Sequence, residues 1–204
     1  MIRKVAVIVA HPDDETLWAG GLLLMHPEWS PVIVALCRRD DPDRAPRFFR
    51  AVEQLGAHGV MGDLDDGPGQ QPQAQAAVMA TILALLPGGE YDLVLTHAPE
   101  GEYTRHLRHE ETSLAVETLW RSGAIKAREL WTFAFEDRGG AHLPRARRDA
   151  SLFVTLPDPV WEAKRNLLTR TYGFSATDWE TRTTPRAEAF QRLEPSRPAV
   201  QHQP

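Results

Sequence analysis

Three short, unbroken apolar runs rich in β-branched residues constrain the fold more than any other feature of the sequence. They occupy residues 5–9, 32–36 and 93–95. Their apolar character is continuous rather than alternating, which indicates strands that are covered on both faces. Strands of this kind are typical of parallel sheets with helices on either side. The runs therefore predict a mostly parallel sheet.

Segments with helical character separate these runs and follow them. In one of them Val78, Ile82 and Leu85 recur at helical spacing. The expected elements are, in chain order, helices over residues 14–25, 46–55, 73–86 and 106–120, strands over 130–135 and 152–156, and a helix over 160–171. Alternating strands and helices are typical of an α/β sandwich.

The composition is that of an ordinary globular protein, with 42% hydrophobic and 25% charged residues in a chain of 204. This length favours a single domain, which we expect to span residues 1–180. Residues 181–204 contain prolines among polar residues and offer little apolar material for packing. We expect them to form a loose C-terminal tail.

Charge and hydropathy argue against several classes of protein. The net charge is −5 and no long basic run occurs, so nucleic acid is not an expected partner. The apolar runs are far shorter than the ~20 residues that span a bilayer. Residues 1–4 lead directly into a strand and leave no room for a secretion signal, so we expect a cytoplasmic protein. Cys37 is the single cysteine, which excludes a disulfide within the chain.

A first cluster of polar residues, His11-Pro12-Asp13-Asp14, stands where the first strand meets the first helix. A corner of this kind can present two metal ligands and a free base at one spot. The alternative is structural, with an aspartate that caps the helix and a proline that stiffens the turn. A cap needs only one carboxylate, however, and a second beside it is repelled unless a cation is near.

A second cluster contains His106 and His109, which are three residues apart and would lie on one face of a helix. It also follows a strand, so it is expected at the same edge of the sheet as His11 and Asp14. Together the clusters predict a His-His-carboxylate site with a coordination position left for water. Zinc suits these ligands, and so does ferrous iron. A solvated helix start is the structural alternative for the histidine pair.

The residues from Ala10 to Glu15, followed by Thr-Leu-Trp-Ala-Gly-Gly, resemble the signature of the LmbE/PIG-L zinc-dependent N-acetylglucosaminyl deacetylases. Arg50 and Glu53 resemble the Arg-x-x-Glu of that family, and residues 105–109 resemble its Gly-His-x-x-His element. The resemblance covers about residues 3–120. It implies a Rossmann-like three-layer α/β sandwich with a mostly parallel sheet.

The resemblance also implies roles for individual residues. The metal ligands would be His11, Asp14 and His109. Asp13 would be the general base, and His106 would assist at the carbonyl or the leaving amine. Arg50 and Asp66 would contact the substrate, although an ion pair of Arg50 and an ordinary turn aspartate are the structural alternatives. The implied activity is zinc-dependent removal of the N-acetyl group from an N-acetylglucosamine-type substrate. The implied partner is a small N-acetylated sugar or glycoconjugate, and a homo-oligomer is compatible with the sequence.

The chain departs from the family pattern at one informative place. Leu107 and Arg108 stand where the family has Pro-Asp, which removes an acid that would hold a histidine charged. Two other functions stay open, a metal-dependent amidase or esterase acting on another acylated metabolite and a non-catalytic metal-binding module. A dinucleotide site is disfavoured because no Gly-x-Gly-x-x-Gly follows the first strand. We expect Glu15 to orient a ligand or cap the helix, and His97 to be a satisfied loop histidine.

Overall fold

A computed structural model describes residues 2–103 and 105–194. Its main feature is a seven-stranded sheet of order β3-β2-β1-β4-β5-β9-β8. The strands are β1 Lys4–Val9, β2 Ser30–Cys37, β3 His58–Leu64, β4 Glu90–Thr96, β5 Lys126–Phe133, β8 Leu152–Thr155 and β9 Ala187–Leu193. β1 to β5 are parallel, whereas β9 runs antiparallel to both β5 and β8. A separate two-stranded ribbon pairs β6 Phe135–Glu136 with β7 Arg145–Ala146. The mostly parallel sheet is confirmed.

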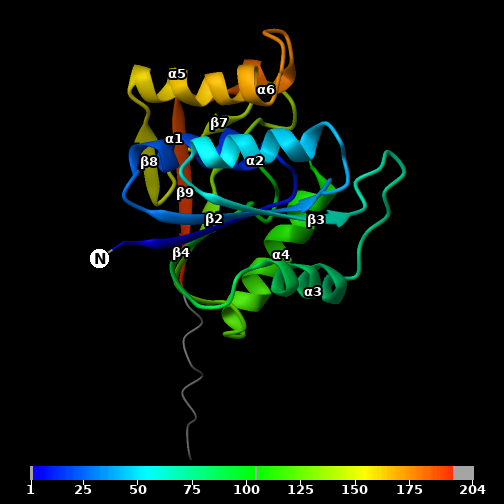
Figure 1. The fold of residues 1–204 in the computed structure, drawn as a ribbon. Coiled ribbons are helices and arrows are strands. Elements are labelled where there is room, and N and C mark those ends of the chain that lie inside the picture. The colour runs from blue at the N-terminus through cyan, green and yellow to red at the C-terminus, as the bar shows by residue number, and fades with distance from the viewer. Residues whose placement is uncertain (1, 104, 195–204) are drawn as a thin grey trace, which may run out of the picture.

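Helices cover both faces of the sheet. They are α1 Asp14–Met25, α2 Arg44–Gln54, α3 Gln75–Leu85, α4 Leu107–Arg121, α5 Asp158–Asn166, which continues as a π-helical turn Leu167–Thr171, and α6 Trp179–Thr183. Figure 1 shows α3 and α4 on one side of the sheet and α1, α2, α5 and α6 on the other. The three-layer α/β architecture is therefore confirmed. Within the described residues, no helix combines the length and apolar character that crossing a membrane requires.

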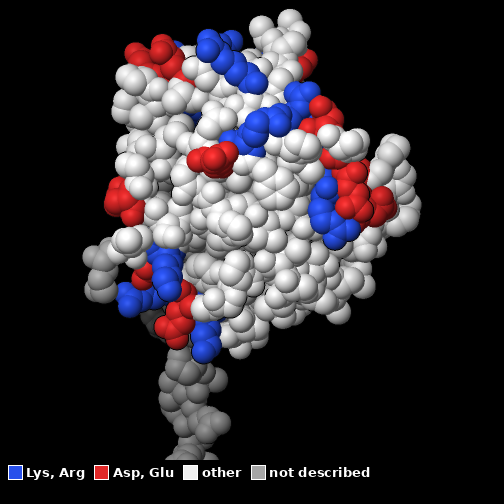
Figure 2. Space-filling model, viewed as in Figure 1, with Lys and Arg blue, Asp and Glu red and all other residues white. Residues whose placement is uncertain are grey.

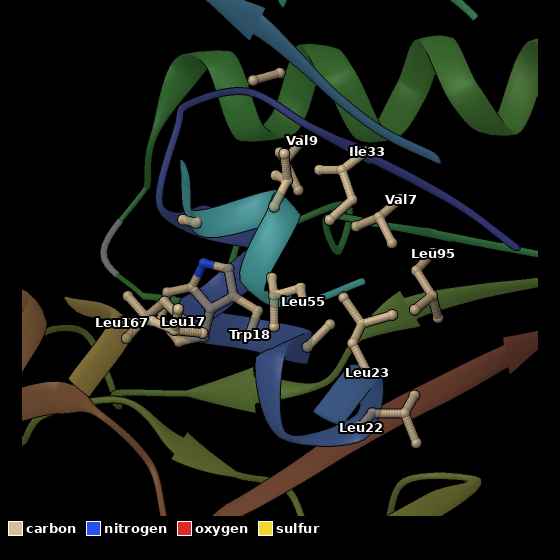
Figure 3. Close-up of a cluster of buried hydrophobic side chains, with 14 of the residues drawn as sticks. Val7, Val9, Leu17, Trp18, Leu22, Leu23, Ile33, Leu55, Leu95 and Leu167 are labelled. Carbon is tan, nitrogen blue, oxygen red and sulfur yellow. The ribbon is translucent and has the colours of Figure 1, made fainter. Parts of the chain in front are cut away.

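The central strands are buried on both faces, which explains their continuous apolar sequence. In β1, Val5, Val7 and Val9 pack toward α1 and α2, and Ala6 and Ile8 pack toward α3 and α4. All five side chains are fully buried. Figure 3 shows the first of these two cores, where strand side chains meet residues of α1 that include Leu17, Trp18, Leu22 and Leu23.

The expectation of a loose tail from residue 181 is wrong for residues 181–194. α6 extends to Thr183, and β9 is inserted between β5 and β8, where Ala189 and Phe190 are fully buried. β9 gave no clear strand signal because its apolar residues are few and its buried Glu188 is charged. Residues 195–204 lie outside the described residues, so the prediction is not tested there.

β3 was not among the strands expected from the sequence. It contains Gly59, Gly62 and Asp63, which are depleted in strands. β3 lies at an edge of the sheet, where such residues are tolerated because only one neighbouring strand has to be matched.

Glu188 of β9 binds the middle of α1. Its two carboxylate oxygens accept hydrogen bonds from the backbone N–H groups of Gly21 and Leu22, each at 2.7 Å, and Oε1 also pairs with Nζ of Lys164 at 2.6 Å. Both charged side chains are fully buried, so each depends on the other for its partner. A Cβ at residue 21 would lie 2.5 Å from the methyl carbons of Leu156 and 2.9 Å from Glu188 Oε1. Any larger residue at this position would force Leu156 and Glu188 to shift.

Two neighbouring glycines of α1 give a matched test of this contact. Gly21→Ala should lower the free energy of unfolding by about 1–3 kcal/mol, because the new methyl group overpacks the contact. Gly20→Ala should instead raise it by ~0.4–1 kcal/mol, because a Cβ there meets its nearest atom at 3.5 Å and alanine restricts the unfolded chain. Urea unfolding of the two variants measures both. Equal stabilities would contradict the close approach of β9.

Candidate metal centre

The candidate site lies at the carboxyl end of the parallel strands. His11 follows β1 and Asp14 begins α1, while His97 follows β4 and His109 lies in the first turn of α4. β1 and β4 are neighbours, and β1 also pairs with β2, so the strand order reverses here. Such a reversal creates a crevice in open α/β sheets and is where their ligands bind. The two sequence clusters therefore meet at one place.

Three atoms of the predicted ligands form a compact triangle. His11 Nδ1 lies 3.1 Å from Asp14 Oδ2 and 3.2 Å from His109 Nε2, and the third side, from His109 Nε2 to Asp14 Oδ2, is 3.3 Å. Ligands placed tetrahedrally around zinc at about 2.0–2.1 Å stand about 3.3 Å apart. The spacing and the nitrogen and oxygen donors therefore fit a tetrahedral divalent ion.

Each ligand histidine has a carboxylate behind it. The far nitrogen of His11, Nε2, lies 3.0 Å from Asp66 Oδ1, and the far nitrogen of His109, Nδ1, lies 2.7 Å from Glu102 Oε2. A carboxylate only accepts hydrogen bonds, so these far nitrogens carry the protons and the near ones present lone pairs to the triangle. This carboxylate–histidine arrangement is the usual support of metal-ligating imidazoles.

The ionisation of Asp14 suits a ligand. Burial acts to raise its pKa, but the neighbouring imidazoles of His109 and His97 hold that pKa well below the usual range. Asp14 Oδ2 also accepts the backbone N–H of His11 at 2.9 Å, and Oδ1 accepts the indole N–H of Trp18 at 3.2 Å. The carboxylate is thus charged and held from both sides.

Two other groupings could hold a metal, one of His11, His106 and His109 and one of Asp14, His97 and His109. His97 Nε2 accepts the backbone N–H of Ala10 at 3.0 Å, so its lone pair is already used. Burial acts to lower the pKa of His97, but Glu102 and Asp14 raise that pKa to about 9. A second proton would have to sit on Nε2, where it would face the N–H group of Ala10, so the hydrogen bond to Ala10 opposes this protonation. The geometry therefore favours the set predicted from the sequence over the grouping with His97.

His106 stacks on His109 with ring centroids 4.4 Å apart and lies on the pocket side of the triangle. Its Nδ1 is buried and has no hydrogen-bond partner in the described part of the chain. Burial, reinforced by His109 and His11, lowers the pKa of His106 to about 4. His106 is therefore a neutral imidazole at pH 7 that borders the candidate metal centre.

Asp13 is held in an uncommon backbone conformation beside the triangle. Its φ of 109° is in the left-handed region, which costs free energy in a residue other than glycine and is seen mostly at functional sites. Glu15 Oε2 accepts the Asp13 N–H at 3.0 Å, and Arg44 Nη1 lies 2.9 Å from Asp13 Oδ2. Burial and the Asp14 charge raise the pKa of Asp13 well above its usual value, and Arg44 opposes this.

The candidate metal centre opens into a pocket of about 170 Å³. The walls supply both charged and aromatic groups, since Arg38 and Arg44 face the pocket together with the rings of Tyr103 and Trp179. The remaining lining residues are His11, Pro12, Asp13, Asp14, Leu17, Asp66, His106 and Glu180. A neighbouring hollow of about 440 Å³ shares Arg44, Trp179 and Glu180 with the pocket and extends it across the surface.

The two predicted substrate contacts have different positions. Asp66 lines the pocket, but its oxygens are engaged by His11 and by Arg38, whose Nη2 lies 2.6 Å away. Arg50 is exposed on α2 and is not among the pocket residues. Arg44 reaches the site instead, because it stands at the start of α2, six residues earlier and therefore about 9 Å nearer along the helix axis.

Several residues of the site had no predicted role in it, among them Arg38, Arg44, His97, Glu102, Tyr103 and Trp179. The one sequence signal for Glu102 and His97 is their position directly after β4, at the edge of the sheet where the histidines gather. Trp179 lies at the pocket wall as the first residue of α6, a helix that the sequence did not indicate.

The assignment of ligands predicts different metal contents for two histidine variants. His109→Ala should lose the bound ion, because it removes one of the three ligand atoms and leaves Glu102 without the imidazole that it supports. His106→Ala should keep close to one equivalent, because His106 lies outside the triangle. Metal analysis after zinc loading and desalting measures both. Loss of the ion from His106→Ala with retention in His109→Ala would contradict the assignment.

No protein-family model and no curated protein matches the sequence. Solved structures match at low identity. GalB, the 4-carboxy-2-hydroxymuconate hydratase from Pseudomonas putida, has a TM-score of 0.67 and 17% identity over 97% of this chain and 98% of its own. Teicoplanin deacetylase Orf2, in a zinc-inhibited form, has a TM-score of 0.62 and 16% identity over 83% and 84% of the two chains.

The N,N'-diacetylchitobiose deacetylase from Pyrococcus horikoshii has a TM-score of 0.65 and 14% identity over 94% of this chain and 84% of its own. At these identities the likeness concerns the fold. The chain has the fold of a set of structures in which deacetylases recur, and its resemblance to the LmbE/PIG-L deacetylases is confirmed at that level.

Proposed function

We propose that this protein is a zinc-dependent hydrolase that removes the N-acetyl group from an N-acetylglucosamine-type substrate. The observation that carries the proposal is the triangle of His11, Asp14 and His109 with the carboxylate of Asp13 beside it. The recurrence of deacetylases among proteins of the same fold supports the reaction class. Ferrous iron fits the same ligands and is the alternative metal.

His11, Asp14 and His109 would hold a divalent ion, which would supply a hydroxide nucleophile at neutral pH and Lewis-acid polarisation of the amide carbonyl. The chain's own contribution is proton transfer by Asp13. In this role Asp13 takes the proton of the attacking water and gives it to the amide nitrogen as the C–N bond breaks, so that acetate and a free amine are released. Burial and the Asp14 charge raise the pKa of Asp13, which makes its carboxylate a stronger proton acceptor.

Three contacts keep Asp13 in place for that role. The Glu15 carboxylate holds its backbone N–H and is itself held by the hydroxyl of Tyr172 at 2.7 Å, while Arg44 holds the Asp13 side chain. Glu15 thus orients the turn of the predicted base, in keeping with the supporting role expected for it. The strained φ of Asp13 is maintained by this network.

His106 is proposed to assist as a neutral hydrogen-bond donor rather than as a cation. The absence of an acid between the two histidines agrees with this, because Arg108 turns away from the pocket. Its guanidinium donates to the carbonyl oxygens of Asp65 and Gln71 and pairs with Glu111. An N–H of His106 directed at the developing oxyanion would stabilise the tetrahedral state.

The pocket wall supports a sugar-like substrate. The rings of Tyr103 and Trp179 lie with centroids 4.6 Å apart on one side of the pocket. Amphipathic rings of this type offer an apolar face to the C–H groups of a sugar and keep a polar edge for hydrogen bonding. The volume of about 170 Å³ admits the acetamide group and the ring beside it, and the adjoining hollow leaves room for an attached group.

A second candidate is hydrolysis of another acylated metabolite that carries an anionic group. Arg38 and Arg44 favour it, because guanidinium groups recognise carboxylates and phosphates in a two-pronged manner. The match to GalB also shows that the fold accommodates a hydratase, so the fold does not itself select deacetylation. Comparing release of free amine from neutral and anionic N-acyl substrates separates the two candidates.

Replacement of the predicted base tests the mechanism. Asp13→Asn should retain about one equivalent of zinc and lower kcat by about 10²–10⁴-fold on a simple N-acetylglucosamine derivative, because the amide cannot take up the proton. Free-amine release and metal analysis on the same preparation provide the two measurements. Asp40→Asn is the matched control, since that side chain is 67% exposed and lies outside the pocket. Unchanged turnover in Asp13→Asn would remove Asp13 from the mechanism.

The aromatic wall is tested by Trp179→Ala. Loss of the ring should raise KM for an N-acetylated sugar by about two- to tenfold, which corresponds to the ~0.5–1.5 kcal/mol of an aromatic contact, with a smaller effect on kcat. Trp29→Ala removes an indole that precedes β2, at the opposite edge of the sheet, and should leave both constants unchanged. Steady-state kinetics of the two variants give the comparison, and equal KM values would exclude Trp179 from substrate binding.

A further inference from the structure

Glu102 is a buried carboxylate shared by two histidines. It lies in the segment between β4 and α4 and is 1% exposed. Its Oε2 lies 2.9 Å from His97 Nδ1 and 2.7 Å from His109 Nδ1, and its Oε1 accepts the backbone N–H of Ala98 at 2.9 Å. The two imidazoles stack on each other, with centroids 3.9 Å apart. Both oxygens of the carboxylate are therefore engaged by donors.

We propose that Glu102 is a positioning residue that fixes His97 and His109 in the tautomer with the proton on Nδ1, and thereby aims the two Nε2 lone pairs in their required directions. The part of this proposal that concerns metal binding rests on the proposed function. A carboxylate has no proton to give, so each Nδ1 that it contacts must carry one, and a neutral imidazole with Nδ1–H has its lone pair on Nε2.

At His109 the consequence concerns the ligand triangle. Its Nε2 lies 3.2 Å from His11 Nδ1 and 3.3 Å from Asp14 Oδ2, so the lone pair points into the position where an ion fits. The opposite tautomer would place an N–H bond there. Glu102 thus selects the form of His109 that is able to bind a metal.

At His97 the consequence concerns the backbone. Its Nε2 accepts the N–H of Ala10, the residue that links β1 to His11. This bond joins the end of β4 to the end of β1 one residue before the first ligand. His97 is fully buried, so no water competes for the bond. One carboxylate in the segment after β4 therefore supports a ligand on α4 directly and the turn after β1 through His97.

An amide could not replace the carboxylate in this position. In one orientation of a glutamine side chain the NH₂ group would face the Ala98 N–H, and in the other it would face the two imidazole N–H groups. In either orientation two N–H donors would face each other. This repulsion could be removed only if an imidazole changed its tautomer or moved away. Glu102→Gln is thus nearly isosteric but should disturb the network.

The first experiment tests the tautomers and needs no metal. Long-range ¹H–¹⁵N correlation spectra of the metal-free protein at pH 8, assigned with single histidine variants, report which ring nitrogen is protonated. We expect Nδ1–H with unprotonated Nε2 at both His97 and His109. An Nε2–H tautomer at either ring, or a doubly protonated His97, would overturn the proposal.

The second experiment measures zinc affinity by competition with a chromophoric chelator. Glu102→Gln should bind zinc about 10–100-fold more weakly than the unaltered protein, the usual effect of losing a carboxylate behind a ligand histidine. Glu110→Gln is the matched control and should bind normally, because Glu110 also lies beside His109 in the sequence but pairs with the exposed Arg105. Circular dichroism verifies folding of both variants.

If Glu102→Gln does not fold, Glu102→Asp takes its place. It keeps the charge but is one methylene shorter, so it cannot reach both rings and Ala98, and weakened zinc binding is again expected. Normal zinc affinity in a folded Glu102 variant would overturn the positioning role. Absence of zinc binding by the unaltered protein, with the expected tautomers present, would instead overturn the proposed function and leave the assignment of tautomers intact.

Discussion

One carboxylate oxygen, Oδ2 of Asp14, is the point on which the site depends. It accepts the backbone N–H of His11 and lies within 3.1–3.3 Å of the near nitrogens of His11 and His109. His11 follows β1, Asp14 begins α1 and His109 lies in the first turn of α4, so contacts to this single oxygen connect three elements. Imidazoles so close together, around a charged oxygen removed from water, need a cation or protons to balance the carboxylate charge. The fold therefore brings together groups whose mutual proximity suits a bound ion.

Much of the fold could be predicted because the strong signals are local. β1, β2 and β4 are covered on both faces, so their sequences are continuously apolar and cannot be confused with amphipathic segments. β9 could not be predicted, because the buried charge of Glu188 is acceptable only where Lys164 and the N–H groups of α1 meet it. That information is absent from any short window of sequence. β3 was obscured for a different reason, since an edge strand tolerates glycine and aspartate.

The same distinction applies to the site. The proximity of His11, Asp14 and His109 could be predicted because helical spacing and the strand-to-helix corner place such groups at one edge of a sheet. The sequence pointed to Arg50, whereas Arg44 is the arginine of α2 that lines the pocket. Only the position of α2 relative to the pocket distinguishes the two. The charge pattern on the surface gives little further guidance, because on the face in Figure 2 basic and acidic side chains lie beside one another.

The insertion of β9 has a consequence for how the protein matures. β8 lies at the edge of the sheet and its neighbour there is β9, which is made about thirty residues later. Until residue 193 has left the ribosome, β8 has no strand to pair with and β5 presents an open edge. The parallel half of the sheet, with the histidines, can assemble on the nascent chain before the segment that carries Trp179 is made. A ligand site formed before its pocket is closed would be accessible to metal during synthesis.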